Sequence, residues 1–66
     1  MDGSVADRLK RARRENPDAI FTVFTLSGHV LTGKITAHDA TLVLEAGRET
    51  AEVSEDRIEA FSFRLP

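Results

Sequence analysis

The chain has 66 residues, a net charge of −2 and no cysteine. This length leaves room for one hydrophobic core, and the lack of cysteine excludes disulfides, thiolate zinc sites and cysteine nucleophiles, so oligomerisation is the expected compensation for a small core. Because no apolar stretch approaches the roughly 20 residues of a membrane-spanning helix, and the start lacks the order of a secretion signal, we expect one cytoplasmic domain over 1–66, without a membrane partner.

The N-terminal segment, residues 4–15, is predicted to form a helix. Apolar residues recur there at helical spacing and form a narrow stripe of Val5, Leu9 and Ala12. Ser4 followed by Asp7 is typical of an N-terminal cap with an acidic residue in the first turn. The Asn-Pro pair after the helix ends it. Since the stripe is thin, the helix needs the rest of the fold to pack against.

From about residue 19 the chain changes to residues typical of β-strands. Residues 20–26 are aromatic and β-branched, and a Ser-Gly turn follows them. The next predicted strand, 29–37, alternates between two faces. One face is expected to carry Leu31, Gly33, Ile35 and Ala37, and the other Val30, Thr32, Lys34 and Thr36. Gly33 lies in mid-strand, which favours a sharp bend or a close approach of two backbones.

Three more strands are predicted, over 41–46, 48–54 and 58–65. Leu42 and Leu44 alternate inward in the first of them. Between the second and third, Glu55-Asp56-Arg57 makes a short turn, which can be one turn of 3₁₀ helix. In the last strand, Phe61 and Phe63 are expected to face opposite to Ile58 and Ala60.

These elements predict a mostly β fold, in which one helix (about 4–15) precedes a highly bent five-stranded barrel (about 19–65). The last strand carries apolar groups on both faces, which is unusual for an exposed edge. The helix or a neighbouring subunit is therefore expected to cover it.

Three features of the chain resemble the first Sm motif: an apolar strand that leads to Gly28, a second strand with a central Gly33, and Asp39 just after it. The run Arg13-Arg14-Glu15-Asn16 at the helix end resembles Hfq, the bacterial branch of the Sm-like family. The resemblance covers residues 5–63. It implies an SH3-like barrel that forms a homo-oligomeric ring, usually a hexamer, when the fourth strand of one subunit pairs with the fifth of the next. It also implies partners, namely single-stranded RNA in the form of small regulatory RNAs and messenger RNAs.

The first RNA surface that the resemblance implies is the rim, where Arg13 and Arg14 match the family's arginines. Lys10 and Arg11 lie beside them on the helix. Guanidinium groups offer forked donors to phosphate. Five of the seven residues 8–14 are basic and none is acidic, which favours RNA binding over an ordinary solvated helix face.

The second surface is the far face of the ring, where the family stacks adenines on an aromatic residue of the first strand. Phe24 stands at that position, and Leu26, Ser27 and Gly28 complete the turn. The alternative is that Phe24 belongs to the barrel core.

The third surface is the pore side, where the sequence departs most from the family. Its candidate residues are His38, Asp39, Thr41 and Arg57. Val5 stands near the family's glutamine, Thr41 near its aromatic residue, and Glu55-Asp56 where it has a basic pair. Acids at that position would repel phosphate and oppose uridine binding.

An enzyme, a cofactor and a small-molecule substrate are not expected. His38 and Asp39 are adjacent in an extended turn and should point apart, and the two histidines lack the cluster of ligands that a metal needs. The leading hypothesis is an RNA-binding ring that acts in post-transcriptional regulation. An alternative is a protein-interaction or structural ring that has lost RNA binding, which the acidic turn favours. A third is a monomeric SH3-like barrel that binds peptides.

Overall fold

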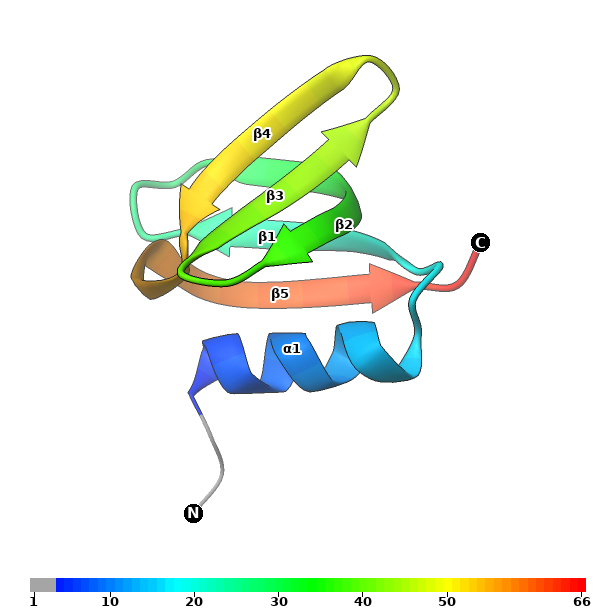
Figure 1. Ribbon diagram of the computed structural model, residues 1–66. Helices are drawn as coiled ribbons and strands as arrows, with labels where there is room; N and C mark the ends of the chain where they lie inside the picture. Colours follow the sequence, from blue (N-terminus) through cyan, green and yellow to red (C-terminus); the bar gives the residue numbers. More distant parts are fainter. Residues whose placement is uncertain (1–3) are drawn as a thin grey trace.

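The computed structural model describes residues 4–66. A helix, α1 (Val5–Glu15), precedes five strands and one 3₁₀ turn, which are β1 (Ile20–Thr25), β2 (Val30–His38), β3 (Thr41–Ala46), β4 (Glu49–Ser54), η1 (Glu55–Arg57) and β5 (Ile58–Arg64). The strands form an antiparallel sheet in the order β4-β3-β2-β1-β5, and α1 lies beside β5 (Figure 1). This confirms the predicted helix and five strands. The sheet is open, with β4 and β5 as its edges, so closure into a barrel stays a prediction.

Helix α1 begins and ends where the sequence predicts. The hydroxyl of Ser4 accepts from the backbone N–H of Asp7, and the Asp7 carboxylate accepts from the N–H of Ser4, both at 3.3 Å. At the other end, Asn16 donates to the carbonyl of Ala12 from its backbone (2.9 Å) and its side chain (3.1 Å). Leu9 is fully buried, so the helix is attached to the core through its apolar stripe. Across residues 4–66, no helix has the length and hydropathy to cross a membrane.

Strand β2 changes partner along its length. Its first half pairs with β1, with Gly33 opposite Phe21, and its second half pairs with β3, with Lys34 opposite Glu45. At the change of partner, a side chain on Gly33 would collide with the backbone carbonyl of Glu45. The close backbone approach predicted for Gly33 is thus confirmed, and it lets one strand serve both halves of the bent sheet.

A bulge in β2 reverses its side-chain alternation. Ile35 lies opposite Leu44 and Ala37 opposite Val43, so Thr36 is an extra residue on β2. Ala37 is exposed as a result, and the prediction that it shares the inward face of Ile35 is wrong. The side chain of His38 is turned inward instead and is fully buried.

A second bulge has the same effect on β5. Thr25 pairs with Ile58 and Phe24 with Ala60, so Glu59 is the extra residue. Ile58 is buried with the core, on the same face as Phe61. The prediction that Ile58 faces opposite to the two phenylalanines is therefore wrong, whereas Ala60 does face away from them.

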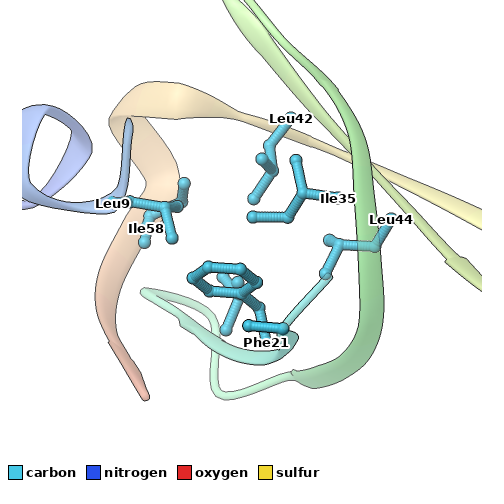
Figure 2. Close-up of a cluster of buried hydrophobic side chains, with 8 residues drawn as sticks. Leu9, Phe21, Ile35, Leu42, Leu44 and Ile58 are labelled. Carbon is cyan, nitrogen blue, oxygen red and sulfur yellow. The ribbon is translucent and has the colours of Figure 1, made fainter. Parts of the chain in front are cut away.

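The core lies between the bent sheet and α1 (Figure 2). Its buried side chains are Leu9, Ala19, Phe21, Val23, Ile35, Leu42, Leu44 and Ile58. Phe21 also contacts the aromatic rings of β5, with ring centroids 6.3 Å from Phe61 and 5.3 Å from Phe63. The core is less complete at the sheet edges, since Phe63 is 43% exposed and Val53 of β4 only half-buried.

Candidate nucleic-acid interface

A basic groove runs beside α1. Lys10, Arg13 and Arg14 line it together with Pro17 and His38, around an open volume of about 460 Å³. The three basic residues stand at helix spacings of three and four, which places them on one side of α1. We call this site the basic groove. Three of the four predicted rim residues meet here, while Arg11 is exposed outside the groove.

His38 reaches the basic groove from the end of β2. Its Nε2 lies 3.0 Å from Oε2 of Glu55. Because an ionised carboxylate only accepts hydrogen bonds, Nε2 carries the proton in the neutral ring. The other ring nitrogen, Nδ1, is buried and has no hydrogen-bond partner among the described residues. The sequence predicts His38 as a pore-side residue, and in the structure it lies beside the basic residues of α1.

Burial controls the charge of His38. Removal of the ring from water lowers its pKa below the usual 6.5, and the negative charge of Glu55, which acts in the opposite direction, does not offset this effect. The positive charges of Lys10 and Arg13 lower the pKa further. His38 is therefore neutral at pH 7.

Glu55 lies next to the groove, a position that sequence reasoning, which placed it in an acidic turn, did not predict. The same Oε2 that contacts His38 also lies 3.4 Å from Nζ of Lys10. The backbone N–H of Glu55 donates to the carbonyl of Ala40 (2.9 Å), which holds η1 against the β2–β3 turn. The sequence showed only an acidic residue in a turn, and its place beside α1 depends on how the sheet bends. One carboxylate thus pairs with Lys10 next to a groove that three basic side chains line, so the basic groups outnumber the acidic one.

Phe24 lies on the opposite side of the sheet from the core. It pairs with Val30 on β2 and Ala60 on β5, and it is 37% exposed. The alternative that Phe24 is a core residue is therefore excluded. Leu26 and Val30 are also exposed, at 60% and 58%. We call Phe24, Leu26 and Val30 the outer apolar residues.

The turn between β1 and β2 is ordered by its own polar groups. Ser27 Oγ lies 3.1 Å from both Thr25 Oγ1 and Nδ1 of His29, and the backbone N–H of His29 donates to Thr25 Oγ1 at 3.0 Å. Gly28 adopts a φ of +88°, which favours glycine. Ser27 and Gly28 are exposed, so this part of the predicted far-face site is accessible.

Of the four predicted pore-side residues, three lie where β2 passes into β3, and Arg57 lies in η1. Asp39 in the turn and Thr41 at the start of β3 are exposed, and the Asp39 N–H donates to the Thr41 carbonyl at 3.2 Å. His38 faces inward, away from Asp39. Arg57 is exposed beside the β1–β2 turn, where its carbonyl accepts from the N–H of Leu26 at 2.9 Å.

Comparison of the chain with protein-family models, curated proteins and solved structures finds no significant match. Within the part of the chain that the structure describes, no group of three or more histidine and acidic side chains could hold a metal ion. The basic groove, the outer apolar residues and the open sheet edges are the surface features of these residues that bear on function.

Proposed function

We propose that this chain is a subunit of an Sm-like ring of the Hfq kind, and that it binds single-stranded RNA through the basic groove. The observation that carries the proposal is the convergence of Lys10, Arg13 and Arg14 on one open groove. Arginine presents several N–H donors in a planar fork that fits phosphate oxygens. An extended strand of RNA offers a phosphate at each nucleotide, so repeated grooves can bind successive phosphates.

The open sheet supports the proposed ring. The outer edges of β4 and β5 have no strand partner among residues 4–66, and unpaired edges are sites where another chain can add a strand. The inward side chains next to these edges, Val53, Phe61 and Phe63, are only partly buried. When β5 of a second copy pairs with β4, it satisfies the backbone groups and covers these apolar side chains. Repetition around a closed ring satisfies every edge.

The outer apolar residues support a second RNA contact. Phe24 exposes part of its ring on the face away from the core. A base that stacks on an exposed aromatic ring gains roughly 1–3 kcal/mol. Since a ring would repeat Phe24 once per subunit, it would offer a series of stacking positions. Stacking alone accepts any base, and the resemblance to Hfq is what leads us to expect a preference for A-rich RNA on this face.

Fluorescence anisotropy with labelled A-rich and U-rich oligonucleotides, at two salt concentrations, tests the proposal. We expect salt-sensitive binding that is tighter for the A-rich strand. The double variant Arg13→Ala, Arg14→Ala should bind more weakly. The slope of its log affinity against log salt should be shallower by about 1–2, because fewer phosphate contacts form and fewer counterions are released on binding.

A matched pair of single variants controls for net charge. Arg14→Ala and Arg48→Ala each remove one exposed guanidinium, but only Arg14 lies in the basic groove. The proposal requires Arg14→Ala to weaken binding more than Arg48→Ala does. If no binding is detected at low salt, the alternative of a ring that does not bind RNA is favoured. The observation that favours this alternative is the pairing of Glu55 with Lys10, because it reduces the positive charge next to the groove.

A further inference from the structure

One carboxylate oxygen next to the basic groove contacts two partners from different elements. Oε2 of Glu55, in η1, lies 3.0 Å from Nε2 of His38 at the end of β2 and 3.4 Å from Nζ of Lys10 on α1. The His38 side chain is fully buried, whereas Lys10 is 42% exposed. The buried partner can change its charge near neutral pH, and the exposed partner is free to move toward a ligand.

We propose that Lys10, Glu55 and His38 couple the binding of phosphate in the basic groove to the uptake of one proton by His38. The coupling rests on the proposed function, because it describes how the RNA phosphate would be held in that groove. It adds a property that RNA binding alone does not require, namely binding that tightens as the pH falls.

In the free protein, Lys10 is the counter-charge of Glu55. His38 is neutral and donates one hydrogen bond from Nε2 to the carboxylate. A phosphate in the groove attracts the ammonium of Lys10, which is exposed and flexible enough to leave Glu55. The carboxylate then faces a buried neutral ring and has lost its nearest positive charge.

Protonation of His38 at Nδ1 gives the Glu55 carboxylate a new positive partner. The ring then becomes an imidazolium that keeps its hydrogen bond to Glu55, so the buried charge is paired. The charged groups that face His38 are Glu55 from η1, and Lys10 and Arg13 from α1. A bound phosphate offsets the two cations, which are the groups that disfavour a charged ring. Both effects favour a protonated His38 in the complex.

The free ring nitrogen of His38 is where the added proton would bind. Nδ1 is buried with no partner among residues 4–66, so no donor competes for its lone pair. Its protonation leaves the hydrogen bond from Nε2 to Glu55 in place, and the imidazolium is paired with the carboxylate through that bond. By linkage, if phosphate favours the protonated ring, the protonated ring favours phosphate to the same degree.

NMR titration of His38 in the full chain tests the coupling, with and without saturating tripolyphosphate or a U-rich RNA oligonucleotide. We expect either ligand to raise the pKa of His38. The affinity for the ligand should increase as the pH falls from 7.5 to 5.5, by up to about tenfold per pH unit when one proton is fully coupled.

Variants separate the coupling from a purely structural role of His38. His38→Gln should lose the pH dependence of binding, whereas His29→Gln, at the exposed second histidine, should keep it. In the free protein, Lys10→Met should raise the pKa of His38 and Glu55→Gln should lower it. If His38→Gln fails to fold, these two titrations still test whether Lys10 and Glu55 control the pKa of His38.

Each outcome separates the coupling from the proposed function. If tripolyphosphate raises the pKa of His38 but RNA does not bind, the proposed function fails and the coupling stands. If the groove signals of Lys10, Arg13 and Arg14 shift while the pKa of His38 is unchanged, the coupling is overturned. It is also overturned if neither ligand perturbs those signals, because the groove then takes no phosphate.

Discussion

Gly33 of β2 lies against the backbone carbonyl of Glu45 in β3. A Cβ placed on Gly33 would lie 2.9 Å from the carbonyl carbon of Glu45, and this neighbour is backbone that cannot rotate away. The contact stands where β2 leaves β1 and pairs with β3. The bend of the sheet therefore depends on the absence of a side chain at this residue.

We expect Gly33→Ala to destabilise the fold by about 1–3 kcal/mol, since an added methyl group must push two strands apart. This is a large share of the roughly 3–5 kcal/mol that a core this small supplies. Urea denaturation followed by circular dichroism measures the loss. Gly47→Asn is the control, because nothing lies within 4 Å of a Cβ there and asparagine tolerates a φ of +65°. Equal stability of Gly33→Ala and the parent chain would contradict the close approach.

The stability of the protein should fall as the pH is lowered from 7.5 to 5.5. The pKa of His38 is lower in the folded chain than in the unfolded one, mainly because the ring is buried. As the pH drops below about 6.5, the unfolded chain takes up a proton that the folded chain does not, so unfolding becomes more favourable. His38→Phe should show a flatter dependence in thermal melts at several pH values. A slope that is the same in His38→Phe and the parent chain would assign the effect to other groups.

Alternation of side chains predicted much of this fold. The helix, the five strands and the 3₁₀ turn lie within one residue of their predicted bounds. The inward positions of Leu42 and Leu44 were also correct, because β3 pairs without a bulge and a period of two holds along it.

The prediction failed where the strands carry an extra residue. Thr36 and Glu59 look like ordinary strand residues, and each becomes a bulge only because of the register of its partner strand. The bulge at Thr36 turns His38 into the protein, where it meets Glu55 from a turn 17 residues later. The register between strands depends on residues far apart in the chain, so it leaves no pattern in the sequence near Thr36 or Glu59. The arginines could be predicted because they share one helix face, whereas their acidic neighbour could not.

Phe24→Ala should weaken binding of A-rich RNA by at least about fivefold, since one stacking contact is worth 1 kcal/mol or more. Stability should change little, because Phe24 is 37% exposed on the face away from the core. Anisotropy titrations and thermal melts on the same sample check both statements. Phe21→Ala, at a buried phenylalanine, should instead cost about 3–5 kcal/mol of stability. Unchanged affinity of Phe24→Ala for A-rich RNA would remove the far-face contact from the proposal.

Phe63→Ser should shift the assembly toward single chains. The ring of Phe63 packs on Phe21 but is 43% exposed at the edge strand β5, where a second copy would cover it. Sedimentation velocity over a range of concentrations measures the shift. Leu65→Ser is the control, because Leu65 lies just beyond β5 and is 66% exposed. If both variants assemble as the parent chain does, the β5 edge is not the contact between subunits.

In the proposed ring, the two open edges of the sheet pair between copies and so gather many basic grooves in one particle. Multi-angle light scattering at micromolar concentration gives the mass of the particle directly. We expect about six times the mass of one chain, as in rings of the Hfq kind. A particle with the mass of a single chain at that concentration would contradict the account.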